Sequence, residues 1–294
     1  MKNRNPILSF ILSLFISGLG QVYNGELRKG LLYLIIFFPI LLVLGLIGLQ
    51  SEFTGFIIVL SIIFLYKLFI SIEAYRTSKK ANPYKLKSIN KNWKYILFAI
   101  FGYMVMWFGT TLSRSITGYE AFEIPTPSME PSIIVGDRVM ATEIDGLEIQ
   151  LGDIITFTRE DGQVYLSRVV GLPEQTIQII SDEVFYEKES EKWTKTKISI
   201  HDSNEFQEFE CELPNGKRFE TKKTIKLYGK VFTESAKSNI EAIQISKDQV
   251  FVMGDNRNNS LDSRYIGSIP YENIDKKINY IWWSKDISRI GKKL

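Results

Sequence analysis

Residues 125 to 131 read PTPSMEP and place one serine, Ser128, among three prolines. Proline fixes its own φ angle near about −65° and disfavours the helical region for the residue before it, so these prolines stiffen the loop in extended conformations. A serine hydroxyl held in this way can be the nucleophile of an acyl transfer if an adjacent base takes its proton. An ordinary turn is the alternative interpretation of the same residues.

Two later stretches also carry residues that could do chemistry. Residues 164 to 174 read VYLSRVVGLPE, which would also suit a core strand. Residues 253 to 267 read MGDNRNNSLDSRYIG, whose Gly, Asp and Asn content would also suit a tight connection. Each stretch alone has a structural explanation, but the three together and in this order indicate a functional site.

In combination, the three stretches resemble the bacterial type I signal peptidases, which are membrane-bound serine endopeptidases that remove signal peptides from exported proteins. The resemblance covers roughly residues 95 to 283, and GDNRNNSLDSRYIG is its most specific segment. It implies N-terminal transmembrane α-helices followed by a mainly-β extracytoplasmic domain of the signal peptidase type with an inserted β subdomain. The implied reaction is peptide-bond hydrolysis without a cofactor or a metal.

Carried over by position, the resemblance makes Ser128 the nucleophile. Thr126 and the backbone N–H of Ser128 would form the oxyanion hole, whose donors typically contribute about 3–4 kcal/mol to the barrier. Met129 would help line an apolar surface that rests at the bilayer.

The third stretch supplies the residues that support this site. The resemblance pairs Asp262 with Arg264 in an ion pair that shapes the site, and it makes Ser260 the residue that orients the general base. It places Asp255 in a tight turn, residues 254–256, beneath that base. These roles are mostly those of a scaffold, which is compatible with a structural turn.

The general base itself is missing from its expected position. The resemblance places a lysine directly before the arginine of the second stretch, where this chain has Ser167 before Arg168. Alternation along a strand puts Ser167 on the face of Tyr165 and Val169, and Arg168 on the opposite face. Burial at position 167 would lower the pKa of a lysine from about 10.4 toward neutrality. A serine can relay a hydrogen bond but cannot hold the proton, and the guanidinium of Arg168 stays protonated.

No other residue has a clear positional claim to this role. His201 lies in a polar stretch and is expected to be a solvated surface residue, and Asp255 and Asp262 could act only through a water. Three interpretations stay open: an active peptidase that recruits another base, a catalytically impaired homologue that binds signal peptides or assists an active partner, and an inactivating substitution in a normal enzyme. Removing one member of such a catalytic unit commonly costs several orders of magnitude in rate.

Short alternating segments must position these residues. From residue 118 onward they read RVMATEI, DIITFTR, QVYLSRVVGL, TIQII, EVFYE, QVFVMGD and NYIWW, which predicts a β-rich domain. Residues 181–247 are strongly charged and predict the inserted subdomain, about residues 175–247, with solvated faces. The single cysteine, Cys211, cannot form an intramolecular disulfide. The sequence contains no Gly-rich phosphate loop and no His or Cys cluster with metal spacing, so no cofactor or metal is expected.

The first part of the chain is expected to lie in a membrane. A hydrocarbon core requires about 20 helical residues, and the segments 31–50, 53–72 and 95–113 are apolar over that length, with Lys67 as their one charged residue. The segment 6–25 is diluted by polar residues, and whether it crosses stays open. The stretch SGLGQVYNGELRKG within it and after it resembles a separate small membrane module to which no function is assigned.

The distribution of Lys and Arg predicts the orientation. Residues 74–94 contain seven Lys or Arg and no Asp or Glu, which is typical of a cytoplasmic loop. We therefore expect a multi-span membrane region at 1–92, an anchor helix at 93–113 and an extracytoplasmic peptidase domain at 114–294 of a multi-pass protein in the bacterial plasma (inner) membrane. The expected partners are signal peptides of exported preproteins, the lipid bilayer and the secretion machinery. The net charge of +3 is too small to indicate nucleic acid.

Overall fold

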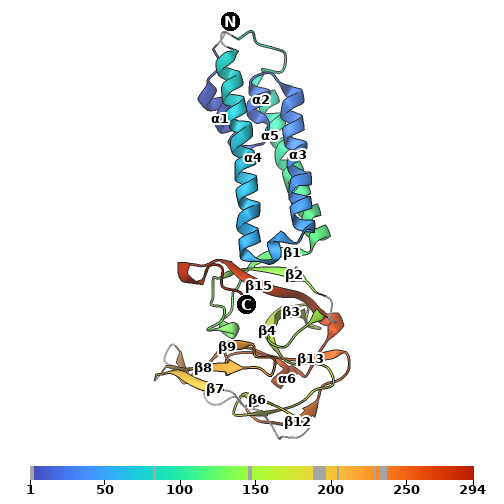
Figure 1. Ribbon diagram of the computed structural model, residues 1–294, viewed down its shortest axis with the longest axis vertical. Helices are drawn as coiled ribbons and strands as arrows, with labels where there is room; N and C mark the ends of the chain where they lie inside the picture. Colours follow the sequence, from blue (N-terminus) through green and yellow to red (C-terminus); the bar gives the residue numbers. More distant parts are fainter. Residues whose placement is uncertain are drawn as a thin grey trace. The chain divides into compact units, whose positions relative to one another are not determined.

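The chain forms two compact units, Met1–Tyr119 and Glu120–Leu294, in a computed structural model (Figure 1). The structure describes residues 3–81, 84–144, 148–187, 197–203, 205–227, 230–231 and 237–294. The sequence placed the start of the outer domain at residue 114. The last long helix continues to Thr117, and the compact units divide two residues after it.

The first unit is helical. Its elements are α1 (Pro6–Phe15), α2 (Leu19–Tyr23), α3 (Leu27–Leu46), the 3₁₀ turn η1 (Leu49–Ser51), α4 (Phe53–Lys80) and α5 (Asn92–Thr117). By length and composition α3, α4 and α5 are able to cross a membrane, and they contain most of each of the three spans predicted from the sequence.

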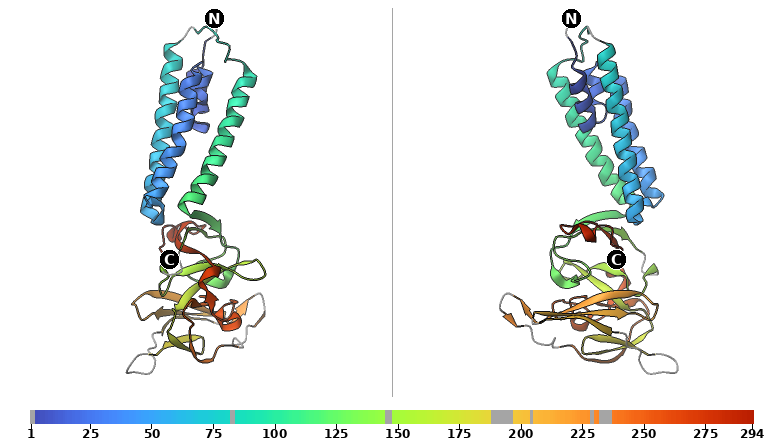
Figure 2. Two further views of the ribbon diagram at one scale, coloured as in Figure 1. Left: turned by 90° about the vertical axis from the view of Figure 1, so that its right-hand side faces the viewer. Right: turned by 60° about the vertical axis from the view of Figure 1, so that its left-hand side comes forward.

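The segment 6–25 forms a short helical hairpin. The ten residues of α1 extend about 15 Å, half of the roughly 30 Å hydrocarbon core. The chain then turns back into α2, and both helices lie beside one end of the long helices, the end at which α4 connects to α5 (Figure 2). Neither helix of this segment has the length that a membrane-spanning helix needs.

Two glycines explain part of the SGLGQVYNGELRKG stretch. Gly18 has a φ of +87°, and a Cβ there would lie 2.0 Å from the carbonyl oxygen of Gly30 at the start of α3. A Cβ on Gly20 would lie 2.1 Å from the carbonyl oxygen of Ser9 in α1. Only glycine permits backbone segments to approach this closely, so the stretch packs the hairpin against its neighbours.

Buried amides complete this packing. The Gln21 side chain accepts a hydrogen bond from the Ser13 hydroxyl at 2.8 Å and donates to the carbonyl of Ile70 at 2.7 Å. The Asn24 amide donates to the carbonyl of Ala74 at 2.8 Å. These bonds join α2 to both α1 and α4, and they satisfy polar groups that lipid could not.

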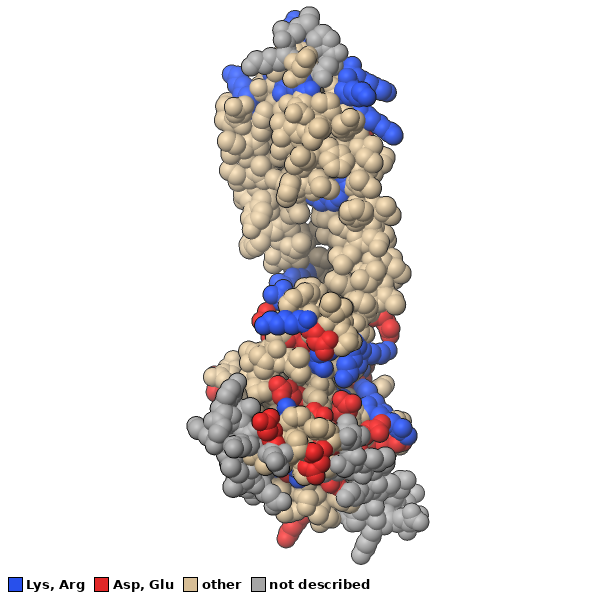
Figure 3. All heavy atoms as spheres, turned by 90° about the vertical axis from the view of Figure 1, so that its left-hand side faces the viewer, with Lys and Arg blue, Asp and Glu red and all other residues tan. Residues whose placement is uncertain are grey.

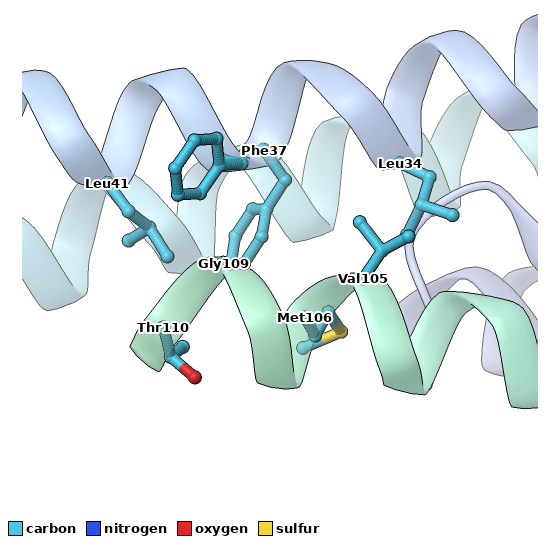
Figure 4. A pocket seen from close by; sticks show the side chains of 8 residues that line it. Leu34, Phe37, Leu41, Val105, Met106, Gly109 and Thr110 are labelled. Atoms are coloured by element: carbon cyan, nitrogen blue, oxygen red, sulfur yellow. The ribbon is translucent and has the colours of Figure 1, made fainter. Parts of the chain in front are cut away.

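Apolar contacts hold α3 to α5. A Cβ on Gly109 would lie 2.7 Å from the ring of Phe38, so the two helices approach closely there. Beside this contact the helices leave a small apolar cavity of about 10 Å³ (Figure 4). On the face drawn in Figure 3, Lys and Arg gather at the end of the helical unit where the chain begins, whereas the long helices show few charged residues along their length.

The second unit is built on a seven-stranded sheet with the order β1-β2-β15-β3-β4-β13-β14. The strands are β1 (Tyr119–Glu123), β2 (Arg138–Glu143), β3 (Ile154–Thr158), β4 (Val164–Gly171), β13 (Gln249–Met253), β14 (Ile269–Pro270) and β15 (Ile274–Trp283). Alternating sequence predicted four of these strands over most of their length, whereas NYIWW is only the end of the longer β15. The fold class, membrane-length helices followed by a mainly-β domain, is confirmed.

An insertion between β4 and β13 carries the remaining strands. One sheet has the order β12-β5-β6, a second has the order β7-β8-β9, and β10 pairs with β11. Their bounds are β5 (Thr176–Ile180), β6 (Glu183–Tyr186), β7 (Lys197–Asp202), β8 (Phe206–Glu212), β9 (Arg218–Thr224), β10 (Lys226–Leu227), β11 (Lys230–Val231) and β12 (Ile240–Gln244). Ile177, Tyr186 and Phe219 pack in one core cluster with Val170 and Phe251 of the main sheet. The insertion is therefore joined to the main sheet by a common core.

Candidate active site

A cleft of about 550 Å³ opens in the β domain where the three sequence stretches meet. Residues 125–131, which contain the 3₁₀ turn η2 (Pro127–Met129), form one wall; this segment is named the nucleophile loop after the role expected of Ser128. The first half of β4 forms another wall, and residues 259–261, which follow β13 and precede the short helix α6 (Ser263–Ile266), form a third. Thr126, Ser128, Ser167 and Ser260 all line this cleft.

Ser128 lies in η2, at the edge of the cleft. Its Oγ atom is 3.3 Å from the Oγ1 atom of Thr126, so the two hydroxyls are neighbours. The backbone N–H of Asn256 donates to the Ser128 carbonyl at 3.0 Å, and the Asn256 side-chain amide donates to the Pro127 carbonyl at 3.1 Å. The turn at 254–256 thus holds the nucleophile loop from behind.

The prediction for Met129 is wrong. Its side chain is fully buried and belongs to a core cluster with Ile133, Ile154 and Ile281. It therefore anchors the nucleophile loop in the interior and contributes no apolar surface. The reason is the 3₁₀ turn: neighbouring side chains diverge there, so Ser128 faces the cleft while Met129 points into the core.

Strand β4 places Ser167 and Arg168 in different surroundings. Ser167 is buried, 2% exposed, and lines the cleft. Arg168 is also buried, but it does not line the cleft, and its guanidinium binds both carboxylate oxygens of Asp255, at 2.9 Å and 2.7 Å. It also donates to the carbonyl of Gly152 at 2.8 Å. Arg168 and Asp255 therefore form a buried ion pair behind the cleft, and both carboxylate oxygens of Asp255 are bound to Arg168.

Both carboxylate oxygens of Asp262 are also bound to internal donors. Its Oδ2 atom accepts hydrogen bonds from the Ser260 hydroxyl at 2.5 Å, from the N–H of Gly254 at 2.9 Å and from Arg264 at 2.8 Å. Its Oδ1 atom accepts from the Nε of Arg264 at 2.9 Å. With both oxygens bound to internal donors, Asp262 fixes the Ser260 side chain.

Sequence reasoning missed a second carboxylate in this network. Asp182, in the turn between β5 and β6, lies 2.6 Å from Arg264 through its Oδ1 atom. Its φ of +64° is a left-handed conformation that Asp tolerates better than most residues. Burial by itself would lower the pKa of Arg264, but the hydrogen bonds and charges of Asp262 and Asp182 raise it. In the sequence, residues 180–183 (ISDE) indicate a turn at Asp182, but nothing in them indicates a contact with Arg264.

The cleft contrasts with this network because its walls are neutral. Among the described residues that line it, none is Lys, Arg, His, Asp or Glu. His201 is exposed on β7 and lies outside the lining. The described residues also contain no group of three or more His, Cys, Asp or Glu that could hold a metal ion. The arrangement thus offers hydroxyl and backbone donors but no lining side chain that could hold the proton of Ser128.

The edge of β4 beside the cleft is open to a further strand. β3 pairs with β4 from Val164 to Arg168, whereas β13 pairs with β4 only from Arg168 to Gly171. No described strand therefore pairs with residues 164–167 on the β13 side. An unpaired edge of this kind can bind an extended peptide through main-chain hydrogen bonds.

A family model described as "Signal peptidase, peptidase S26" matches residues 93–283 of the chain. The chain belongs to this family of membrane-anchored serine endopeptidases. The match includes α5 and nearly all of the β domain, and it leaves α1 to α4 outside.

The chain is also similar to individual proteins. The chain is 27% identical to a signal peptidase I of Rickettsia bellii over 69% of its own length and 76% of the relative, and 29% identical to that of Rickettsia conorii over 58% and 73%. A crystal structure of a signal peptidase I from Enterococcus faecalis is 20% identical and covers 43% of this chain and 93% of the other, with a TM-score of 0.25.

Proposed function

We propose that this protein cleaves N-terminal signal peptides from exported preproteins, with Ser128 as the nucleophile. The observation that carries the proposal is the meeting of Ser128, Thr126 and the open edge of β4 in one cleft. Ser128 Oγ would attack the scissile carbonyl, and the Thr126 hydroxyl with the Ser128 N–H would stabilise the oxyanion. Ser260, fixed by Asp262, would supply a further polar contact within the cleft.

The substrate would bind as an extended segment alongside residues 164–167. Main-chain hydrogen bonds to this edge would fix its register, because they do not depend on the substrate's side chains. The apolar side chains of Phe122, Ile124, Leu166 and Leu261 also line the cleft. They would accept small apolar side chains of the substrate on either side of the scissile bond.

The helical unit would hold this reaction at the membrane. We infer that α3, α4 and α5 cross the bacterial plasma membrane, with the basic residues 74–94 on the cytoplasmic side and the β domain outside. A signal peptide is itself bound to the bilayer. Anchoring both partners raises the effective concentration of the scissile bond without any new contact, and it brings the site near the secretion machinery.

The neutral cleft favours a second candidate function, which is binding of signal peptides without efficient turnover. Ser167 stands where a buried amine would serve as the base, and both nearby carboxylates are bound to internal donors. Such a protein would retain the peptide-binding edge and the oxyanion donors but would lack a proton acceptor. It could then assist an active peptidase by presenting or retaining the signal peptide.

One set of variants separates the two functions. The detergent-solubilised full-length protein is incubated with a preprotein, and cleavage is compared for wild type, Ser128→Ala, Ser167→Lys and the double variant. Cleavage by wild type that Ser128→Ala abolishes supports the peptidase. No cleavage by wild type, with activity appearing in Ser167→Lys and disappearing in the double variant, supports the binding protein.

We expect Ser167→Lys to raise the Ser128-dependent rate about 10²- to 10⁴-fold, the usual contribution of a positioned general base. Ser246→Lys is the matched control, because it adds the same charge at an exposed serine outside the cleft lining. If no variant cleaves the preprotein and no variant binds a signal peptide, both proposed functions are wrong.

A further inference from the structure

Strand β9 of the insertion lies directly against the turn that holds the nucleophile loop. The N–H of Lys222 donates to the carbonyl of Asp255, and the N–H of Arg257 donates to the carbonyl of Lys222, each at 2.8 Å. Lys222 thus forms a parallel bridge with Asn256. Because Asn256 binds the Ser128 carbonyl in turn, an unbroken set of backbone contacts runs from the insertion to the nucleophile.

The side chain of Lys222 reaches the same loop from another direction. Its Nζ atom lies 2.8 Å from the Oε2 atom of Glu130, two residues after Ser128. The side chains of Lys222 and Glu130 are 18% and 22% exposed, so water screens this pair less than a surface pair. The Lys222 ammonium also lies 4.6 Å from the ring centroid of Phe206 on β8, a cation–π distance.

Thr224, on the same strand, strengthens the connection. Its hydroxyl donates to the side-chain oxygen of Asn256 at 3.1 Å, and its N–H donates to the side-chain oxygen of Asn258 at 2.8 Å. The Asn256 side chain therefore has both its ends bound, one to the nucleophile loop and one to β9. The insertion fixes the orientation of this amide as well as the backbone of the turn.

We infer that Lys222 is a positioning residue for Ser128, and that the inserted subdomain sets the geometry of the nucleophile. Lys222 fixes the loop through Glu130 on one side and through the turn at Asn256 on the other. It does not line the cleft, and its ammonium is bound by a carboxylate and a ring, so it acts through the loop and takes no proton from Ser128. The inference rests on the proposed function in that Ser128 is the reacting group.

The test measures kcat and KM for Ser128-dependent cleavage, in wild type or, if that is silent, in the Ser167→Lys background. We expect Lys222→Met and Glu130→Gln each to lower kcat about tenfold with KM changed less than twofold, since the peptide-binding edge of β4 is untouched. Combining them should cost no more than either alone. Lys222→Arg should retain at least half of kcat, because it keeps the ion pair.

Arg218→Met is the matched control, since Arg218 is a cation on the same strand that pairs with Glu212, away from the nucleophile loop. It should leave kcat unchanged. The inference is overturned if Lys222→Met leaves kcat unchanged. It is also overturned if Lys222→Arg is as inactive as Lys222→Met, which would make Lys222 the proton acceptor.

A second measurement keeps the inference testable if no variant cleaves. In the full-length protein with Ser128→Cys and Cys211→Ser, the rate at which iodoacetamide alkylates the introduced thiol reports on the loop without any catalysis. We expect Lys222→Met to raise this rate at least threefold and Lys222→Arg to restore it. Equal rates for all three residues at position 222 would overturn the inference, whereas absent cleavage alone would count only against the proposed peptidase.

Discussion

The surface of the cleft and the layer directly behind it differ in charge. The described residues that line the cleft are neutral, and several of them carry hydroxyl or amide groups. Behind them lie two buried ion pairs, Arg168 with Asp255 and Arg264 with Asp262, whose side chains are at most 4% exposed. The neutral layer suits a polypeptide backbone, and the charged layer holds the loops that form the cleft.

This difference shows why charge near a site does not by itself indicate catalysis. A buried charge persists only when it is paired and hydrogen-bonded, and such pairing consumes the lone pairs that proton transfer would need. Asp255 and Asp262 belong to the segment that contacts the Ser128 loop, yet both bind internal donors. Position 167 is where a side chain of this domain could bring a base to the cleft wall without breaking an existing pair.

The largest expected effect on stability comes from removing one partner of a buried ion pair behind the cleft. Asp262→Ala would leave Arg264 buried with only Asp182 as its acidic partner, and it would also remove the acceptors of Ser260 and Gly254. Breaking a buried pair in this way typically costs about 3–5 kcal/mol. We expect that loss in the free energy of unfolding of the β domain, measured by urea denaturation.

The surface pair of Arg138 and Glu123 provides the contrast. Its side chains are 45% and 57% exposed, so Glu123→Gln should change the free energy of unfolding by less than about 1 kcal/mol. If the two substitutions lower the free energy of unfolding equally, the buried ion pair of Asp262 and Arg264 does not stabilise the domain more than a surface pair.

A smaller effect is expected where the two layers touch. A Cβ on Gly254 would lie 2.4 Å from the Cβ of Ser260 and 2.8 Å from the carbonyl oxygen of Ser128. Gly254→Ala should therefore displace both groups, and overpacking of this kind costs about 1–3 kcal/mol. A thermal melt gives the stability change, and cleavage in the Ser167→Lys background should fall with it. An unchanged melting temperature would contradict the close contact.

The smallest effect concerns a lysine at the margin of the charged layer. Burial lowers the pKa of Lys217 from its usual value of 10.5, although Asp153, at 3.2 Å, partly offsets this. Between the lowered pKa and 10.5 the unfolded chain binds more protons than the folded one, so stability should rise with pH in that window. Urea midpoints measured from about pH 8 to about pH 10.5 should rise more for wild type than for Lys217→Met. Parallel profiles would show that Lys217 titrates alike in both states.

Local patterns in the sequence predicted much of this architecture. Short runs of apolar and alternating residues predicted β2, β3, β4 and β13, and long uninterrupted apolar runs predicted α3, α4 and α5. The motif stretches brought Ser128, Ser167 and Ser260 to one site, and the structure places all three in the same cleft.

Contacts between distant parts of the chain could not be predicted in this way. Lys222 and Glu130 are 92 residues apart, and Asp182 and Arg264 are 82 apart, so no local periodicity links them. Met129 was misassigned for a related reason, since which neighbour of Ser128 points inward depends on the core beneath the loop. The hairpin of α1 and α2 depends on glycine contacts with α3, which composition alone does not reveal.

The position of Ser167 on strand β4 has a consequence for how proteins of this fold can evolve. Ser167 lines the cleft, whereas the next residue, Arg168, does not line it and binds Asp255, so exchanging one residue need not disturb the other. Hydrolytic and non-hydrolytic descendants of one ancestor could therefore share the same backbone and the same stability. If Ser167→Lys raises the Ser128-dependent rate as expected, a single substitution at one wall of the cleft separates peptide binding from hydrolysis.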